Sequence, residues 1–355
     1  MIASQSTSKE WIESISKSKK ADKILVEKVI RALILLEGLK ESGLDFIFKG
    51  GTALMLLFGS SKRLSIDIDI ILPDKELDLS GILDEICKNR GFIRYEKQNR
   101  KAGTKIKKDH YKLFFTSSLN GQESTILLDV LREDIHYKNT IESSIESDFV
   151  KQEGNALTVK VPDYNNILGD KLTAFAPNTT GIPYRKGEKE MGMEIIKQMY
   201  DIGCLCDYVD NPAVFSEVFS SFAETEIAYR DNICKVSDVL EDIIESALSV
   251  CLRQTIGNAN FDILSRGIVQ VKSFVFSESF HLEKAITYAA KAAYLGVLIK
   301  YRVAEIKRFN PTENMKEWTI QEPMNTKLNK IKKTNPEAFY YLYQIWDISN
   351  NSKSD

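Results

Sequence analysis

The sequence is short of the residues that several common kinds of site require. It has three histidines in 355 residues, and their scatter argues against a histidine-based catalytic triad or zinc chemistry. Five cysteines are an odd number with irregular spacing, and Cys204-x-Cys206 has neither a second pair nor a nearby histidine to complete a zinc site. We therefore expect reduced thiols that pack in the core of an intracellular protein.

Strong net charge and long apolar runs are also missing. A formal net charge of −2 argues against general polyanion binding, so any contact with nucleic acid must come from a local patch. No apolar run approaches the roughly 18 residues that span a bilayer, and residues 1–20 lack the apolar core of a signal peptide. Neither a G-x-x-x-x-G-K-[ST] loop nor an EF-hand loop is present. We expect a cytoplasmic protein with no membrane partner.

The sequence does contain 43% apolar residues, which is enough to form buried cores. Its length is enough for about two domains. Up to Pro162, helical and alternating patterns are mixed, and after it nearly every long segment has helical spacing. We predict an α/β (α+β) domain with a mixed sheet at 1–162 and an all-α helical bundle at 163–355. The strand patterns lie at 45–49, 64–72, 92–98, 110–118, 124–133 and 156–162, with a hairpin turn at 119–122. The helical patterns lie at 8–42, 52–59, 78–91, 163–176, 187–209, 211–230, 236–254, 279–308 and 325–348.

The stretch KGGTALMLLFGSSKRLSIDIDII (49–71) carries the strongest chemical signal. In a strand, alternate residues share a face, so Ser65, Asp67 and Asp69 are expected on one side. Two neighbouring carboxylates repel each other and are costly to bury unpaired. A divalent cation removes that cost, and Mg²⁺ is typically held by one or two carboxylates together with substrate phosphates.

The glycine pair Gly50-Gly51 fits the same interpretation. It joins the strand at 45–49 to the N-terminus of a helix, where free N–H groups and a positive dipole end favour a phosphate. Taken separately, alternating acids are also typical of a solvated strand face, and two glycines of a plain turn. Together with Arg63 and Ser65, just before the acids, they favour a phosphate cradle beside a metal site.

These residues resemble a known family. KGGTAL…RLSIDIDI is similar to the minimal nucleotidyltransferases of the polymerase-β superfamily, and more narrowly to the AbiEii/AbiGii-type toxins of type IV toxin–antitoxin and phage-abortive systems. The family pattern G-G-T-x-L, R-x-S-x-D-h-D and D-K-L-x-A matches residues 50–54, 63–69 and 170–174. A last block departs, since Lys197-Gln198 stands where Arg-Asp is usual, before Asp201. The resemblance covers roughly residues 30–210, and no motif in the helical tail matches.

The resemblance implies a site drawn from both predicted domains. It implies an NTP substrate and Mg²⁺, or Mn²⁺, as cofactor. The implied metal ligands are Asp67, Asp69 and Asp129. The implied nucleotide-binding residues are Gly50, Gly51, Thr52, Ser65, Lys171 and Asp201, and the helical domain contributes Lys171 and Asp201.

Three of these residues could also have purely structural roles. Asp129 is a lone acid in an apolar strand, which suits a third carboxylate that binds a cation, but Arg132 nearby could pair with it. The resemblance implies that Lys171 reaches the triphosphate, a role that suits its mobile point charge, although a helix lysine is more often solvated. Asp201 could orient Lys171 or the base, or balance local charge.

One segment is strongly basic. Residues 90–112 hold nine Lys or Arg and two acids, interleaved with Phe92, Tyr95, His110 and Tyr111. This composition suits RNA, with aromatic rings available for base stacking, although a solvated hairpin is the simpler alternative. Three further basic residues could extend such a patch: Arg185, Lys186 and Lys189.

These observations favour an enzyme that transfers NMP from an NTP to an acceptor hydroxyl. The resemblance suggests a toxin that acts on a tRNA 3′ end, under the control of a cognate antitoxin. Two alternatives remain open. The acceptor could be a protein side chain or a small molecule, or the protein could bind nucleotide and signal without catalysis.

Overall fold

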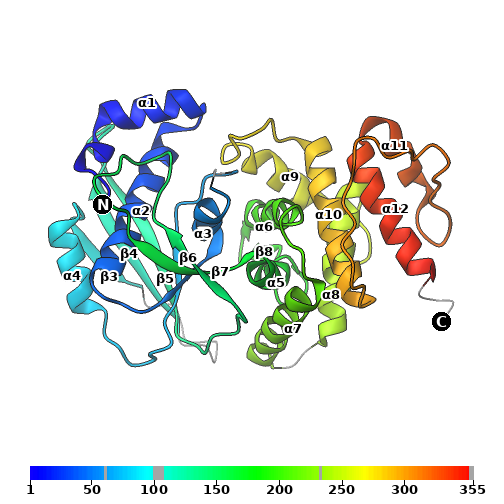
Figure 1. Cartoon of the computed structure of the whole chain (residues 1–355), viewed down its shortest axis with the longest axis horizontal. Helices are drawn as coiled ribbons and strands as arrows, with labels where there is room; N and C mark the ends of the chain where they lie inside the picture. The colour runs from blue at the N-terminus through cyan, green and yellow to red at the C-terminus, as the bar shows by residue number, and fades with distance from the viewer. Residues whose placement is uncertain (60–61, 99–107, 232–233, 352–355) are drawn as a thin grey trace. The chain divides into compact units, whose positions relative to one another are not determined.

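The computed structural model describes residues 1–59, 62–98, 108–231 and 234–351 (Figure 1). The chain divides into two compact units. The first comprises Met1–Asp163 and Ser273–Glu278, and the second comprises Tyr164–Lys272 and Ser279–Asp355. The first unit holds a mixed sheet and the second is mostly helical. The predicted fold class, an α/β domain followed by a helical region, is therefore confirmed.

In the described part of the chain the first unit is built on a seven-stranded sheet with the order β3-β4-β5-β2-β1-β7-β6. Its strands are β1 (Ile47–Lys49), β2 (Ile68–Ile71), β3 (Arg94–Lys97), β4 (Lys108–Thr116), β5 (Glu123–Leu131), β6 (Thr140–Ser144) and β7 (Thr158–Pro162). Strands β2 and β5, and strands β1 and β7, run parallel, and the other neighbouring pairs are antiparallel. The sequence did not predict β6. Three of its five residues are polar, one Glu and two Ser, and the strand is mostly exposed at the edge of the sheet.

The predicted acid strand is shorter than expected, and it carries Asp69 but not Asp67. The sequence places a strand at 64–72, but β2 begins at Ile68. The N–H of Leu64 donates instead to the carbonyl of Phe274 at 2.8 Å. The segment Ser273–Glu278 thus pairs with the residues before the acids, which explains why it belongs to the first unit.

The helices of the first unit are η1 (Ser4–Thr7), α1 (Lys9–Lys19), α2 (Lys23–Glu41), α3 (Gly50–Leu57) and α4 (Ser80–Asn89). The single helix predicted at 8–42 is in fact two. Lys20 adopts a left-handed conformation with φ of +52°, and Asp22 then caps α2 by accepting from the N–H groups of Ile24 and Leu25. Helix α2 is apolar on nearly all sides because it is buried along most of its length.

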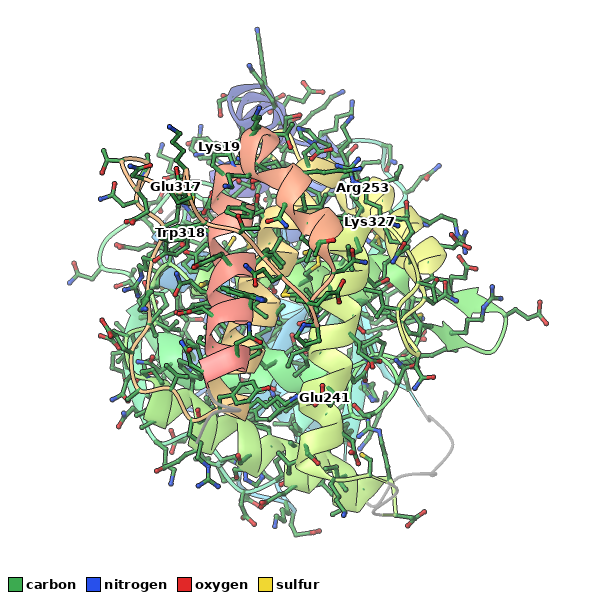
Figure 2. All side chains as sticks on the ribbon, turned by 90° about the vertical axis from the view of Figure 1, so that its right-hand side faces the viewer. Lys19, Glu241, Arg253, Glu317, Trp318 and Lys327 are labelled. Carbon is green, nitrogen blue, oxygen red and sulfur yellow. The ribbon has the colours of Figure 1, made fainter. Side chains whose placement is uncertain are left out.

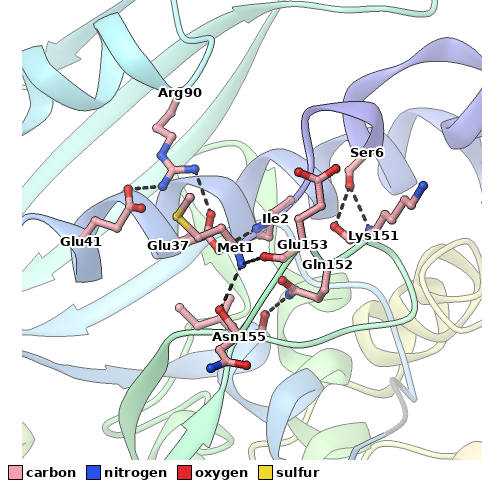
Figure 3. A network of polar contacts seen from close by, with 11 residues as sticks. Met1, Ile2, Ser6, Glu37, Glu41, Arg90, Lys151, Gln152, Glu153 and Asn155 are labelled. Carbon is pink, nitrogen blue, oxygen red and sulfur yellow. Dashed lines mark hydrogen bonds and ion pairs between the residues drawn. The ribbon is translucent and has the colours of Figure 1, made fainter.

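A fully buried carboxylate holds the start of the chain against α2 and α4 (Figure 3). Glu37 of α2 accepts from Nη1 of Arg90 at 2.9 Å and from the N–H of Ile2 at 2.8 Å. Arg90 also pairs with Glu41, one turn further along α2. Because the Glu37 side chain has no exposed surface, its negative charge is stabilised by these donors and not by water.

We expect Glu37→Gln to destabilise the first unit by about 3 kcal/mol, because removal of one partner from a buried ion pair leaves the other uncompensated. Urea denaturation of the variants in a Trp318→Phe/Trp346→Phe background, followed by the fluorescence of Trp11, measures this loss. Glu41→Gln is the matched control: it faces the same arginine but is 35% exposed, and we expect a change below about 1 kcal/mol. Equal losses from the two variants would contradict the assignment.

The second unit contains η2 (Thr326–Lys330) and the helices α5 (Tyr164–Ala174), α6 (Gly192–Leu205), α7 (Pro212–Tyr229), α8 (Val236–Leu252), α9 (Phe261–Val271), α10 (Leu282–Lys300), α11 (Ile331–Thr334) and α12 (Pro336–Asn351). A small hairpin joins β8 (Arg185–Lys186) to β9 (Lys189–Glu190). Helix α10 lies at the centre of this unit, in contact with α6, α8 and α12, and most of its residues are buried. The sequence did not predict α9.

The helix predicted at 279–308 is wrong beyond residue 300. Helix α10 ends at Lys300, and residues 303–310 have no regular structure. Aromatic contacts fix the segment that follows. Trp318, labelled in Figure 2, stacks on Tyr343 of α12 with ring centres 4.4 Å apart and also contacts Tyr340. This part of the chain is therefore held by side chains rather than by a helical backbone.

Candidate active site

Strand β1 leads directly into helix α3, and two glycines form the junction. Gly50 has φ of +81°, a conformation that residues with a Cβ rarely adopt. The backbone therefore turns at Gly50 and immediately starts the helix. The first N–H groups of α3 have no acceptor within the helix, so this end is suited to an anion.

Side chains that follow α3 in the sequence lie close against both glycines. A Cβ on Gly50 would overlap with Oδ2 of Asp69 and lie 2.8 Å from its Cγ. A Cβ on Gly51 would lie 2.6 Å from Oγ of Ser65 and 2.7 Å from Nη2 of Arg63. The glycine turn and the acid strand, which the sequence predicts as neighbours, are thus in direct contact.

Thr52 ties the two elements together. Its side chain is fully buried, and its hydroxyl donates to the backbone carbonyl of Asp67 at 2.6 Å. The resemblance implies a nucleotide-binding role for Thr52. In this arrangement its hydroxyl is directed to the protein, and it positions the residue that carries the first acid.

The strand pairing places four polar side chains in one row across the sheet. Lys49 of β1 lies opposite Asp69 of β2, Asp69 lies beside Asp129 of β5, and Asp129 lies opposite His110 of β4. Residues paired in this way project from the same face. The sequence predicts a site role for the two aspartates of this row, but none for Lys49 and only a general stacking role for His110.

Asp129 is held by His110. Nδ1 of His110 lies 2.6 Å from Oδ1 of Asp129, and the two side chains are 14% and 39% exposed. An ionised carboxylate can only accept a hydrogen bond, so Nδ1 carries the hydrogen. In the neutral imidazole, Nε2 is then an acceptor. The second carboxylate oxygen of Asp129 has no partner among the described residues.

Arg132, the alternative partner of Asp129, is engaged elsewhere. Its Nε donates to Oδ2 of Asp109 at 2.6 Å, and its Nη atoms donate to backbone carbonyls that precede α4. Burial alone would raise the pKa of Asp109, but hydrogen bonds from Lys97 and Arg132 hold that pKa below its ordinary value. Arg132 therefore neutralises Asp109, and the partner of Asp129 is His110.

In the second unit, Lys171 and Asp201 form a buried ion pair. Nζ of Lys171 lies 2.9 Å from Oδ2 of Asp201 and 3.0 Å from Oε1 of Gln198. The two charged side chains are 6% and 4% exposed. The contact between Asp201 and Lys171 that the sequence allowed is present. Gln198, whose role the sequence left open, supplies a neutral acceptor to the same ammonium group.

No group of three Asp, Glu, His or Cys side chains is arranged to hold a metal ion within the described residues. The residues nevertheless fit a cation that is shared with a substrate. Asp67 and Asp69 are partly exposed, oxygen-only ligands, and Asp69 lies against the glycine turn at the N-terminus of α3. Two carboxylates completed by substrate phosphates are a usual environment for Mg²⁺.

The sequence from residue 34 to residue 267 matches the family described as nucleotidyl transferase AbiEii toxin, type IV TA system. This match covers well over half of the chain and includes all four motif blocks. The chain belongs to the AbiEii family. It is therefore a nucleotidyltransferase, and its family implies an NTP substrate and an antitoxin partner.

Several solved structures match this chain at low sequence identity and with TM-scores below 0.5. MenT4, a nucleotidyltransferase toxin from Mycobacterium tuberculosis H37Rv, is 11% identical, with a TM-score of 0.47 over 94% of this chain and 98% of its own. JHP933 from Helicobacter pylori is 15% identical, with a TM-score of 0.42 over 80% and 94%. Among curated proteins, none matches this sequence. The family assignment depends on the sequence match.

In this AbiEii protein, fewer side chains of the basic stretch at 90–112 are available to bind RNA than its composition suggests. Arg90, Arg94 and Lys97 form ion pairs with acidic side chains. Phe92 and Tyr111 are buried, so the expectation that they are available to stack on bases is wrong. Residues 99–107, with four of the nine basic side chains, lie outside the described residues.

Two of the three basic residues of the β8–β9 hairpin are paired as well, and the third, Lys186, is exposed. Arg185 bonds to Glu190, and Lys189 bonds to Glu194. They are a weak basis for an extended patch. No helix in the described part of the chain is long and apolar enough to cross a membrane.

We expect Asp201→Asn to destabilise the second unit by about 3 kcal/mol, because it leaves the ammonium group of Lys171 buried with a neutral acceptor only. The double variant Lys171→Met/Asp201→Leu should recover much of this loss, since an apolar pair of similar volume is often neutral. Urea denaturation measures both effects. If the pair serves catalysis, the double variant regains stability without regaining transfer. Recovery of both would mean that the pair is only structural.

Proposed function

We propose that this AbiEii protein transfers NMP from an NTP to the 3′-terminal hydroxyl of a tRNA in a Mg²⁺-dependent reaction. The observation that carries the proposal is the close approach of the Asp69 carboxylate to Gly50 at the start of α3. This contact supports the proposal because it would bring a phosphate site and a cation site together, and a reaction at a triphosphate needs both at once.

The residues around the glycine turn would bind the β- and γ-phosphates. The N–H groups at the start of α3 supply oriented donors, and Gly50 and Gly51 let a phosphate approach the backbone. The Ser65 hydroxyl, which lies against Gly51, adds a further donor. In a low-dielectric site, fixed donors of this kind stabilise developing charge without reorganisation.

Asp67 and Asp69 would hold Mg²⁺, and the carboxylate oxygen of Asp129 not bonded to His110 would contribute on the acceptor side. When bound, the ion lowers the pKa of the acceptor hydroxyl and neutralises charge on the triphosphate. Asp69 and Asp129 are adjacent in the register of β2 and β5, so both project from the same face of the sheet. Thr52 fixes the backbone of Asp67 by donating to its carbonyl.

The reaction is an in-line displacement at the α-phosphorus. The acceptor oxygen forms a bond to phosphorus as the bond from phosphorus to the β-bridging oxygen breaks. The hydroxyl proton passes to solvent water, and pyrophosphate leaves with the bonding electron pair. Such a reaction depends mainly on positioning and electrostatics, which rigid strand ends and a helix N-terminus supply.

From the family motif at 170–174 we infer that Lys171 binds the triphosphate. Asp201 and Gln198 hold its ammonium group, which restricts an otherwise flexible side chain. Support for this assignment comes from the match of residues 170–174 to the family motif and from the unusual burial of a lysine. Because Gln198 is neutral where an aspartate is usual, it binds the ammonium group without adding a second negative charge beside Asp201.

An RNA acceptor is favoured over a protein or a small molecule by the lysines of β4, which lie on the same face as the acids. With an NTP and tRNA as substrates, the enzyme would act in the cytoplasm, as a toxin restrained by an antitoxin and active in phage defence. Protein and small-molecule acceptors are the competing outcomes of the labelling experiment that tests the proposal.

The test is incubation of the purified protein with Mg²⁺, one α-labelled NTP at a time, and total tRNA, followed by a denaturing gel. We expect label in tRNA with one preferred nucleotide, and none when EDTA is present. Label on a protein band would replace the RNA acceptor with a protein. An NTP that binds but is never transferred to tRNA, to protein or to a small molecule would contradict the proposal.

A further inference from the structure

Strand β4 presents a second set of polar residues beside the acids. Lys108, His110 and Lys112 alternate along it, so they share one face. The register places His110 opposite Asp129, and Asp129 lies beside Asp69. The face that carries the acids therefore continues, one strand further, into two lysines and a histidine.

The two lysines differ from the other basic residues of the 90–112 stretch that the structure describes. Arg90, Arg94 and Lys97 are each engaged by acidic side chains. Lys108 is exposed and Lys112 partly exposed, and neither has an ion-pair partner in the described ranges. Their charge is thus available to a ligand, and lysine binds phosphate well as a point charge.

His110 is fixed in one orientation. Asp129 accepts from Nδ1 at 2.6 Å, which sets the tautomer and leaves Nε2 as the acceptor of the neutral ring. No partner of Nε2 is found among the residues described, and 14% of the side chain remains exposed. A base that is oriented by a carboxylate is the usual arrangement for engaging a hydroxyl group.

We propose that the β4 face formed by Lys108, His110 and Lys112 binds the acceptor RNA, with Nε2 of His110 accepting the hydrogen bond of its terminal hydroxyl. This inference rests on the proposed RNA acceptor. It assigns the two sides of the site. The glycine turn and Asp69 bind the NTP, and β4 binds the RNA that receives the NMP. Asp129 lies between them and contacts His110 through one oxygen only.

The test of His110 uses two amide variants. In His110→Asn, the amide nitrogen takes the place of Nδ1 and keeps the bond to Asp129, but nothing replaces Nε2. We expect kcat for tRNA to fall roughly 10²-fold, with unchanged KM for NTP and unchanged Mn²⁺ binding by electron paramagnetic resonance. His110→Gln, whose amide reaches further, should recover part of kcat. An asparagine variant with the wild-type kcat would overturn the proposal and reduce His110 to a positioning residue for Asp129.

The test of the lysines measures binding without chemistry. An RNA that ends in a 3′-deoxynucleotide can bind but cannot accept NMP. For Lys108→Gln/Lys112→Gln we expect weaker binding of this RNA, with the slope of log K against log salt reduced by about 1.4, since each lost contact to single-stranded RNA removes about 0.7. Lys9→Gln/Lys23→Gln makes the same charge change at exposed positions and should leave the slope unaltered. Equal changes in the two variants would overturn the proposal.

Failure of this inference is distinct from failure of the proposed function. A wild-type protein that labels no RNA contradicts the RNA acceptor itself. A wild-type protein that labels tRNA, with either of the two negative results, for His110→Asn or for the β4 lysine variant, contradicts only the role of β4.

Discussion

Asp67→Asn/Asp69→Asn is expected to abolish nucleotidyl transfer and toxicity together. The substitutions preserve side-chain size but remove the two negative charges that hold the cation. Loss of metal-based stabilisation of the transition state amounts to several kcal/mol, and about 4 kcal/mol corresponds to a rate reduction of roughly 10³-fold. Incorporation of label from the preferred NTP into tRNA measures the rate, and growth after induced expression measures toxicity.

The matched control is Asp45→Asn/Asp134→Asn, which removes two carboxylates from exposed surface ion pairs of the same unit. We expect wild-type transfer, because such pairs contribute little. Mn²⁺ binding separates loss of metal from loss of fold, and thermal melting reports the fold. Transfer retained by the Asp67/Asp69 variant, with melting unchanged, would remove these residues from the site.

The elements that form the site could be predicted from the sequence because their signals are local. Two glycines, an apolar helix and an alternating acid strand lie within 49–71, and each feature restricts the backbone near it. The structure places Asp69 against Gly50 as these signals suggest. The extent of the strand was less predictable, since residues before Ile68 pair with Ser273–Glu278, about 200 residues further along the chain.

The role of His110 depended on the register of a hairpin. A turn at 119–122 would place Lys112 opposite Asp129. The observed hairpin is centred one residue earlier, and this shift moves the partner by two residues, to His110. His110 and Lys112 lie on the same face of β4, because alternate residues of a strand project to the same side. The sequence could therefore predict that β4 adjoins the third acid, but not which of its side chains does.

Two errors in the helical regions have different physical causes. The break at Lys20 is local: Asp22 caps α2, and an aspartate inside an apolar helical pattern is a signal for such a start. The end of α10 at Lys300 has no equivalent signal. The following chain is held by side-chain contacts, such as the Tyr294 hydroxyl, which accepts from the N–H of Lys307, and Arg308, which donates to the carbonyl of Val209. Helical periodicity within 279–308 does not report such contacts.

Burial decided which residues of the basic stretch remain candidates. Tyr111 lies between His110 and Lys112, as a ring that stacks on bases would, but Tyr111 and Phe92 are both buried. Lys108 and Lys112 project from the face of β4 opposite to Tyr111, together with the acids. The composition of 90–112 suggested a polyanion, and the alternation along β4 shows which side chains of the described part can meet one.

Gly50→Ala is expected to disable the enzyme through the position of a single carboxylate. A Cβ at this position would overlap with Oδ2 of Asp69, so the carboxylate must move away from the N-terminus of α3. The backbone conformation, with φ of +81°, adds about 1–2 kcal/mol of strain. We expect transfer to fall by at least about 10²-fold, since a displacement of about 1 Å at a reacting centre can have that effect, and Mn²⁺ binding to weaken with it.

Gly43→Ala separates strain from displacement. Gly43 has nearly the same φ, +78°, but a Cβ there would meet nothing within 4 Å. Its substitution should cost a similar amount, about 1–2 kcal/mol of backbone strain, and leave transfer and Mn²⁺ binding intact. Urea denaturation and the label-transfer assay, applied to both variants, distinguish the two effects. If Gly50→Ala and Gly43→Ala transferred label equally well, the contact between the glycine turn and Asp69 would be a feature of packing, and the phosphate and metal sites would have to be sought apart from each other.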